Sequence, residues 1–277
     1  MNKPAPRSLR ARVSAEEWEL RVNLAACYRL VARYGMTDLI YNHITARVPG
    51  PEHHILINAY GMLYEEVTAS SLIKVDLGGA IVDNGDTDYS VNAAGYIIHS
   101  AVHEAREDAH CVIHTHTPAG IAVSAMEEGL LPLSQTAMRF HGHVAYHDYE
   151  GPAFNRGEKR RLVDHLGDKS AMILRNHGLL VCAPSIPQAF NLIYWLEQAC
   201  RIQVQLLSSQ RPLHKANKKV VALTSDALSG MEITLDNESA TNPNLKRGAQ
   251  KAGSGYGMLE WPALLRALDR QDTSYRN

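Results

Sequence analysis

Three histidines stand in two short stretches whose spacing suits metal binding. Residues 110–116 read HCVIHTH, and residues 175–178 read RNHG. Side chains of an extended strand alternate between two faces, so His114 and His116 are expected to point the same way. His177 falls in a turn between two apolar segments, where a third imidazole could be held rigidly. Three histidines with an open position describe a catalytic metal site.

Other arrangements of these residue types stay open. An HxH spacing is common, so ordinary surface or core histidines are one alternative. His99 and His103 are four residues apart on a predicted helix and would share a face. They could form a separate metal pair, or His99 could lie near the other three histidines and orient them or contact the substrate. Glu65 and Glu66 could supply an acid, although their place at the end of a predicted strand favours a solvent-facing role.

A first helix and a group of strands precede these histidines. The residues from Ser14 to Glu17 have the spacing of a capping box, which predicts a helix start, and Gly35 suits its end. Short apolar runs between Gly, Pro, Asn and Asp then predict antiparallel strands. Those strands are expected at residues 43–48, 54–60, 72–77 and 80–83.

The remaining pattern alternates between helices and strands. Helical periodicity predicts helices at residues 93–107, 119–128, 156–166, 186–208 and 259–268. Apolar runs predict strands at residues 109–116, 143–146, 171–174 and 179–182. After residue 210, the stretches KANKK, NESATNPN and QKAGSGYG are typical of loops. We therefore predict one α/β domain at residues 14–210, after a tail at 1–13. An extension at 211–277 would end in a helix that packs on its own or a neighbouring subunit.

Composition narrows the class of protein. The chain has 277 residues, a formal net charge of −1 and 45% hydrophobic residues, which is typical of a soluble globular protein. A near-zero charge argues against general nucleic-acid binding. No apolar stretch has the length of a signal peptide core or a membrane span. Four scattered cysteines predict free thiols in a reducing compartment, so we expect a cytoplasmic protein without disulfides.

The histidine stretches also carry a resemblance. VIHTHTPAG and ILRNHGLLV, together with YNHITARV and INAYGMLYEEVTASSLIKVD, closely resemble the class II aldolase/adducin family over roughly residues 14–210. That resemblance implies a central, mainly antiparallel sheet flanked by helices. It also implies a divalent metal held by His114, His116 and His177, and a homo-oligomer, commonly a tetramer with active sites at subunit boundaries.

The chain departs from the aldolase pattern at one position that matters for chemistry. The family's sugar-phosphate aldolases place a proton-transferring glutamate where this chain has Gly95, and a pair of phosphate-binding serines where it has Ala93 and Ala94. These differences disfavour a phosphorylated sugar substrate. By the same resemblance, substrate contacts would fall on Asn42, Tyr60, Gly61 and Gly95. Tyr146, Tyr149 and His99 are the candidate catalytic residues, although a structural role for the tyrosines is equally open.

Three functions remain. Stretches such as NAAGYIIHSAVHEA and LEWPALLRALDRQDTSYRN resemble the adducin-like branch. The first function is a lyase that cleaves a carbon–carbon bond or decarboxylates a small non-phosphorylated 2-oxo or hydroxycarbonyl compound, using Zn, Fe(II) or Mn. The second is a non-haem iron oxygenase for oxidative decarboxylation of an aromatic 2-oxo acid, of the prenylated hydroxyphenylpyruvate type. The third is a non-catalytic oligomeric scaffold.

Overall fold

A computed structural model describes residues 8–151, 156–228 and 256–277 of the chain. Within them, a single sheet runs in the strand order β4-β3-β2-β1-β5-β8-β7-β6. All neighbouring strands are antiparallel except β6 and β7, which are parallel. The mainly antiparallel sheet expected from the sequence is therefore confirmed. The strands are β1 (His43–Arg47), β2 (Ile55–Ile57), β3 (Ile73–Val75), β4 (Ile81–Asp83), β5 (Cys111–Thr115), β6 (Val144–His147), β7 (Ala171–Leu174) and β8 (Gly178–Ala183).

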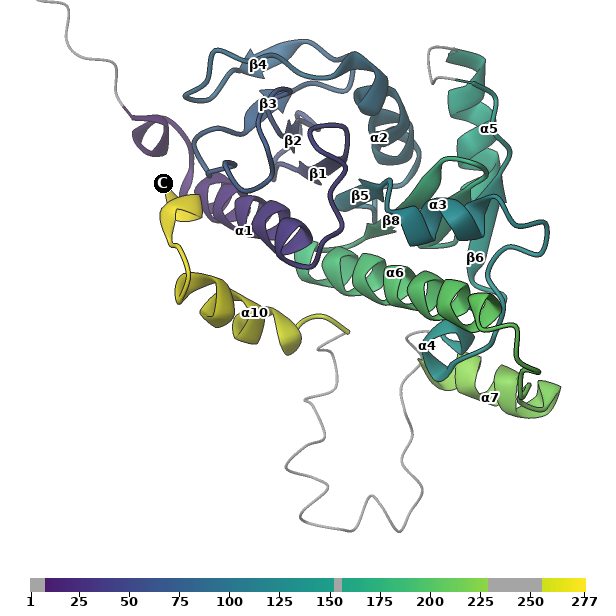
Figure 1. The fold of residues 1–277 in the computed structure, drawn as a ribbon. Helices are drawn as coiled ribbons and strands as arrows, with labels where there is room; N and C mark the ends of the chain where they lie inside the picture. The colour runs from purple at the N-terminus through teal and green to yellow at the C-terminus, as the bar shows by residue number, and fades with distance from the viewer. Residues whose placement is uncertain (1–7, 152–155, 229–255) are drawn as a thin grey trace, which may run out of the picture.

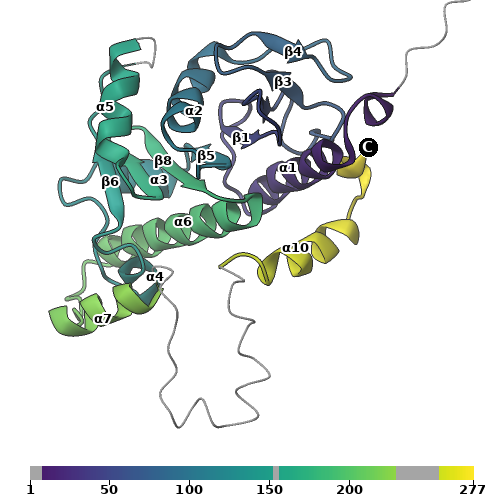
Figure 2. The same cartoon turned by 180° about the vertical axis from the view of Figure 1, so that it is seen from behind.

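Helices cover both faces of the sheet (Figures 1 and 2). Adjacent residues of β5 pack into different cores. Ile113 joins the cluster under α1 and α6, and Val112 joins the cluster under α2 and α5. The helices are α1 (Ala15–Arg33), α2 (Ala93–Ala105), α3 (Pro118–Ser124), α4 (Gln135–Met138), α5 (Arg156–Leu166), α6 (Ile186–Ser208), α7 (Lys218–Leu228) and α10 (Glu260–Asp269), with 3-10 turns η1 (Leu9–Ala11) and η2 (Ser274–Arg276).

The first helix begins and ends where the sequence predicts, but only half of its capping box forms. The Ser14 hydroxyl accepts a hydrogen bond from the amide of Glu17 at 3.1 Å. The Glu17 carboxylate does not complete the box; it pairs with Arg21 at 2.9 Å and Lys74 at 2.8 Å. Gly35 follows the helix at φ +64°, a conformation that glycine adopts without a side-chain clash.

The prediction of a loop at KANKK, residues 215–219, is wrong for Lys218 and Lys219, which begin α7. Its lysine-rich start reads as polar, yet Val221 is 5% exposed and the Ser225 hydroxyl donates to the carbonyl of His141 at 2.7 Å. Contacts with α4, a short helix that the sequence pattern did not reveal, thus stabilise a helix that local composition does not favour. NESATNPN lies outside the described residues, as does most of QKAGSGYG.

The end of the chain packs against its own first helix. Trp261 of α10 is 6% exposed, and its indole N–H donates to the side chain of Asn23 at 2.8 Å. Tyr275 is fully buried, and its carbonyl accepts from the amide of Ala69 at 2.9 Å. Of the two expected packing partners for the terminal helix, the structure shows the chain's own.

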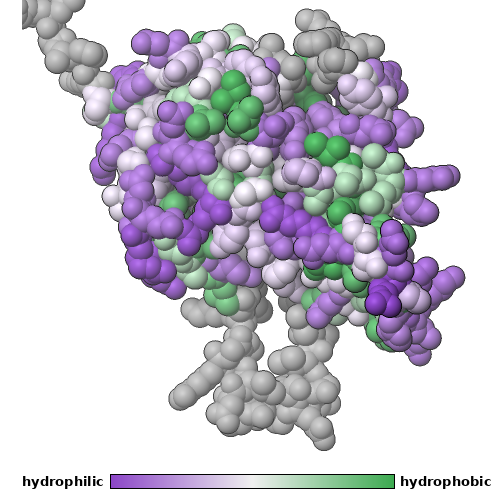
Figure 3. Space-filling model, in the orientation of Figure 1, coloured by the Kyte–Doolittle hydropathy of each residue, from purple (hydrophilic) through white to green (hydrophobic). Residues whose placement is uncertain are grey.

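The thiols of Cys27, Cys111, Cys182 and Cys200 are free and buried, as expected from the sequence. No helix in the described residues is long and apolar enough to cross a bilayer. Figure 3 shows one face of the molecule, where apolar residues lie in separate patches among polar ones.

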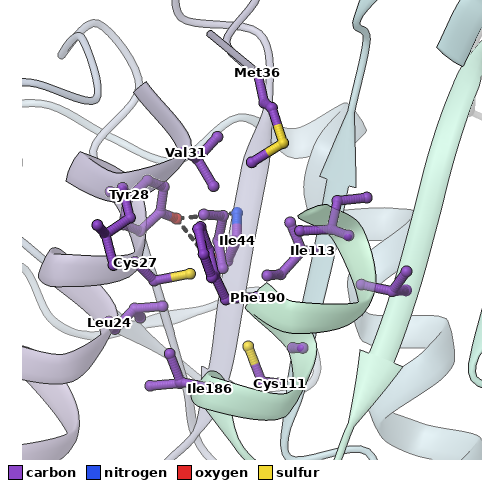
Figure 4. Packing of buried hydrophobic residues seen from close by; sticks show 14 of the residues in the cluster. Leu24, Cys27, Tyr28, Val31, Met36, Ile44, Cys111, Ile113, Ile186 and Phe190 are labelled. Atoms are coloured by element: carbon purple, nitrogen blue, oxygen red, sulfur yellow. Dashed lines mark hydrogen bonds between the residues drawn. The ribbon is translucent and has the colours of Figure 1, made fainter. Parts of the chain in front are cut away.

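A buried tyrosine connects α1 to β1, which is the strand next to β5, and to the residue after β2. Tyr28 lies in the main core with Ile44, Phe190 and Ile113 (Figure 4). Its hydroxyl accepts from the amides of Ile44 at 3.1 Å and Asn58 at 3.0 Å. The same hydroxyl donates to the Ile44 carbonyl. One phenol therefore satisfies backbone groups at the start of β1 and just after β2.

Tyr28→Phe should lower the free energy of unfolding by about 1–3 kcal/mol, because two buried amides lose their acceptor. Urea denaturation followed by circular dichroism measures this change. Tyr89→Phe is the matched control, since Tyr89 is 52% exposed and its loss of a hydroxyl should change stability by less than about 0.5 kcal/mol. Equal effects of the two substitutions would contradict the assigned role.

Candidate metal centre

The structure brings His114, His116 and His177 together. The Nε2 atoms of His114 and His116 lie 2.7 Å apart, and those of His116 and His177 lie 3.0 Å apart. The Nε2 atoms of His114 and His177 are 3.3 Å apart. Within the described part of the chain, the three form the one group of at least three His, Cys, Asp or Glu side chains that lie close enough to hold a metal ion. A tetrahedral zinc ion with Zn–N bonds of about 2.0–2.1 Å places its ligand nitrogens roughly 3.3 Å apart, which matches the His114–His177 separation and is longer than the other two.

Backbone contacts between β5 and β8 fix the first and third histidines. The Nδ1 of His114 donates to the carbonyl of Leu179 at 2.9 Å. His177 directly precedes β8, after Asn176 with a φ of +55°. Gly178 is needed beside it, because a Cβ there would lie 2.3 Å from the carbonyl oxygen of Thr115. The turn can approach β5 only with glycine at this position.

Side chains on other elements fix the second histidine. His116 follows the end of β5, and its Nδ1 donates to the carboxylate of Asp38 at 3.1 Å. The next residue, Thr117, caps α3 by accepting from the Gly120 amide at 3.1 Å. Its hydroxyl also donates to the buried carboxylate of Glu197 on α6. Contacts of this kind orient a metal ligand and set which nitrogen carries its proton.

The hydrogen bonds of the triad engage the Nδ1 atoms and leave the Nε2 atoms available to a cation. His114 and His116 each donate a proton from Nδ1, so in the neutral form of either ring the Nε2 atom carries a free lone pair. Those two Nε2 atoms lie 2.7 Å apart. Two lone pairs at that distance repel unless a positive charge lies beside them. The residues present therefore fit a divalent metal ion.

Burial favours the neutral, ligating form of these rings. Burial first, and then the neighbouring His116 and His177, hold the pKa of His114 well below its usual range. Burial followed by His116 lowers the pKa of His177 to about 4. Neutral imidazole is the form that binds metals, so both rings are ready for an ion at neutral pH.

A second line of histidines runs along α2 on the same side of the sheet. The Thr45 hydroxyl lies 2.8 Å from Nδ1 of His99 and 2.8 Å from Nε2 of His103. The Nδ1 of His103 donates to the Ala109 carbonyl at 2.9 Å, so its Nε2 accepts from Thr45. Thr45 then accepts from His99, which leaves Nε2 of His99 unprotonated and buried without a partner. These contacts place His99 and His103 in a hydrogen-bonded chain, in contrast to the alternative of a separate metal pair.

The two candidate catalytic tyrosines occupy different environments. Tyr149 is 54% exposed, and its ring centre lies 6.2 Å from that of His177. Tyr146 packs under the guanidinium of Arg175 at 4.4 Å, and its hydroxyl accepts from the Leu130 amide at 3.0 Å. The structure thus brings Tyr149 to the triad and gives Tyr146 a place in the packing around α3.

The four residues predicted to contact the substrate also lie in different environments. Asn42 is fully buried and donates to the carbonyl of Met36 at 2.9 Å, while its own side-chain oxygen has no partner. Tyr60 is 36% exposed, with its ring 6.4 Å from that of Tyr41. Gly61 has a φ of +121°, and a Cβ there would lie 2.9 Å from the ring of Tyr89. Gly95 lies against the ring of His43.

Sequence reasoning missed three residues that shape this region. Asp38 lies 78 positions before His116 in the chain, a separation that offers no sequence signal. His43 and Thr45 did offer one, because they alternate along a predicted strand and must share a face. Only the register of β1 against β5, in which His43 is opposite His114, shows that this face is the one that carries the triad.

Buried neutral histidines make stability depend on pH. Burial is the main cause that lowers the pKa of His103 from 6.5 to about 3. The unfolded chain therefore binds a proton below about pH 6.5 that the folded chain refuses until about pH 3. The stabilising contribution is complete above pH 6.5 and is lost as the pH falls through this window, by up to about 1.4 kcal/mol per pH unit.

His103→Asn removes one such group. It should therefore reduce the loss of unfolding free energy between pH 6 and pH 4 by up to about 1.4 kcal/mol per pH unit. Denaturant titrations at several pH values measure the slope in the wild type and the variant. His141→Asn is the control, because His141 is exposed and should leave the slope unchanged. Indistinguishable slopes for His103→Asn and the wild type would contradict this account.

The chain is similar to known proteins in both sequence and fold. Residues 22–204 match the family described as Class II Aldolase and Adducin N-terminal domain. A crystal structure of an aldolase II superfamily protein from Pseudomonas syringae is 47% identical, with a TM-score of 0.84, and the match covers 98% of this chain and 100% of that one. An L-fuculose 1-phosphate aldolase from Glaciozyma antarctica is 25% identical, with a TM-score of 0.75 and coverage of 100% and 97%.

The other branch of the family is equally close in sequence. Alpha-adducin of Rattus norvegicus is 53% identical over 191 residues, which are 69% of this chain but 26% of that protein. The similarity is therefore to one part of a much longer protein. The family match over all eight strands of the sheet and the high identity to a solved superfamily member show that this chain belongs to the class II aldolase/adducin family.

Proposed function

We propose that this chain is a metal-dependent lyase that cleaves or decarboxylates a small, non-phosphorylated 2-oxo or hydroxycarbonyl compound. The observation that carries the proposal is the convergence of three Nε2 atoms within 3.3 Å of one another, with the Nδ1 atoms of His114 and His116 engaged on the far side of their rings. His114, His116 and His177 would hold the ion, for which zinc, Fe(II) and manganese are candidates. A bound divalent ion would polarise a carbonyl and stabilise the negative charge that develops on its oxygen.

The surrounding residues suit an organic substrate without phosphate. Ala93 and Ala94 contribute no hydroxyl groups at the start of α2, where the family resemblance places phosphate-binding serines. Gly95 contributes no carboxylic acid. Tyr149 is the phenol beside the triad, so it is the better candidate for giving a proton to the product carbon. Tyr146 uses its hydroxyl in a backbone contact.

His99 is a buried neutral residue near the proposed metal centre. Burial first, and then His43 and His103, hold its pKa well below the usual range, so the ring is neutral. Its Nδ1 is committed to Thr45, and its free Nε2 is an acceptor. We assign it the role of accepting a hydrogen bond from a substrate hydroxyl or an ordered water.

The scaffold alternative is supported by the identity to alpha-adducin. It predicts a triad that binds no ion under conditions where the fold is intact. The oxygenase alternative has no support of its own in the relatives described above. Metal content separates the three functions, because iron would favour the oxygenase and zinc or manganese the lyase.

Purified protein should contain about one divalent ion per chain, measured by inductively coupled plasma mass spectrometry after anaerobic purification. His116→Ala removes one of three ligands and should lower that content at least tenfold. His141→Ala, at an exposed histidine, should leave it unchanged. Wild-type protein that folds normally and binds neither zinc, manganese nor iron would reject the lyase and favour the scaffold.

The metal-loaded chain should release pyruvate from oxaloacetate or from 4-hydroxy-2-oxo acids, followed by a lactate dehydrogenase assay. Tyr149→Phe should lower the turnover number by about 10²–10⁴-fold with metal content unchanged, because it removes a proton donor. Tyr146→Phe should act mainly on stability, through the loss of its contact with Leu130. Activity restricted to sugar phosphates would contradict the proposed substrate class.

A further inference from the structure

A fourth histidine lies beside the triad and has no role in the site described so far. His43 begins β1, is 3% exposed and is opposite His114 in the register of β1 and β5. Residues directly opposite each other on antiparallel strands share a face, with Cβ atoms about 4.5–5.5 Å apart. The His43 side chain therefore projects from the sheet next to a proposed metal ligand.

The His43 ring fills the space of a missing side chain on α2. A Cβ at Gly95 would lie 2.0 Å from Cδ2 and 2.2 Å from Nε2 of His43, distances that real atoms do not adopt. The His43 imidazole thus occupies the volume that any residue other than glycine would take at position 95. The Nδ2 of Asn92 lies 3.3 Å from the same Nε2 and holds this edge of the ring.

Two buried ring nitrogens in this region have unused hydrogen-bonding capacity. The Nε2 of His99 has no hydrogen-bond partner, and the Nδ1 of His43 has none of ordinary geometry, although the Asn58 side chain lies close to the His43 ring. The two rings are perpendicular, with centres 6.2 Å apart. Buried polar groups are almost always paired in native proteins, so these nitrogens are available to an ordered water or a polar ligand at the proposed centre.

We propose that His43 is a substrate-positioning residue, which hydrogen-bonds an oxygen of the substrate at the triad and does so from the volume that Gly95 leaves free. This inference rests on the proposed lyase function and narrows its substrate class. An imidazole tolerates an anionic oxygen nearby, whereas a carboxylate at position 95 would repel it. The His43–Gly95 pair therefore favours a 2-oxo acid, with its carboxylate, over a neutral hydroxyketone.

The charge state of the ring agrees with this role. Burial is the largest cause that lowers the pKa of His43 to about 4. The contact with the Asn58 side chain raises the pKa by less than burial lowers it, and His116 adds a smaller lowering effect. The ring is therefore neutral at pH 7, with one nitrogen as donor and one as acceptor. A neutral ring adds no positive charge that would compete with the ion for the substrate.

Oxalate, a planar dianion that resembles the enolate of a 2-oxo acid, tests the proposal by isothermal titration into zinc-loaded protein. His43→Ala should weaken oxalate binding at least tenfold, with zinc content and melting temperature close to wild type. His43→Gln, which keeps a donor and an acceptor, should recover part of the loss. His141→Ala is the control and should bind oxalate as the wild type does. Unchanged affinity in His43→Ala would overturn the proposal, as would loss of zinc from that variant.

A second pair of variants tests the shared volume without any ligand. Gly95→Ala alone should lower the melting temperature, because its methyl group and the His43 ring cannot both fit. His43→Ala with Gly95→Ala should recover most of that loss. Additive effects of the two substitutions would overturn the steric pairing.

The outcomes separate this inference from the function on which it rests. Wild-type protein that binds no ion rejects the proposed function and, with it, the role of His43 in positioning substrate. Wild-type protein that binds zinc but not oxalate leaves the metal centre intact and rejects the 2-oxo acid assignment. Zinc and oxalate binding that is insensitive to His43 rejects the positioning role alone.

Discussion

The rest of the site depends on one constraint, which is that three imidazoles are held with their Nε2 atoms at one point. His114 and His116 cannot turn away, because a backbone carbonyl and a carboxylate hold their opposite nitrogens. The strand pairing of β5 with β8 then brings His177 to the same place. The neighbouring elements thus hold the three Nε2 atoms together, in an arrangement that suits a cation. Gly178 and the Thr117–Glu197 contact are parts of the same constraint.

The face of the sheet under α2 is unusually rich in histidine for a protein interior. Thr45 links His99 and His103 in one hydrogen-bonded chain that ends at a backbone carbonyl. Each ring is neutral because burial lowers its pKa, so several titratable groups coexist without charge repulsion. The chain also orients His99, since a fixed tautomer leaves only one of its nitrogens free.

Much of this could be predicted from local pattern. Strand alternation correctly placed His114 and His116 on one face, and the apolar runs on either side of Asn176 correctly predicted a turn that presents His177. The contribution of Asp38 could not be predicted, because it depends on where a loop after α1 meets β5 in space. The difference between Tyr146 and Tyr149 was hidden for a related reason. The sequence pattern separates the two side chains, but only the contacts with Arg175 and Leu130 show that Tyr146 is the one directed away from the triad. The α7 helix was missed because its stability comes from contact with α4, which local composition does not encode.

The separation of the ligands along the chain has a consequence for how the protein folds. His114 and His177 are 63 residues apart in sequence, and their approach requires β5 and β8 to pair. A non-local pairing of this kind must overcome a larger loop-closure entropy than local contacts do. Before these strands pair, the chain can offer at most the two histidines of HCVIHTH to the proposed ion. Metal uptake would report on completion of the sheet, and metal scarcity would act on the finished fold and not on its early intermediates.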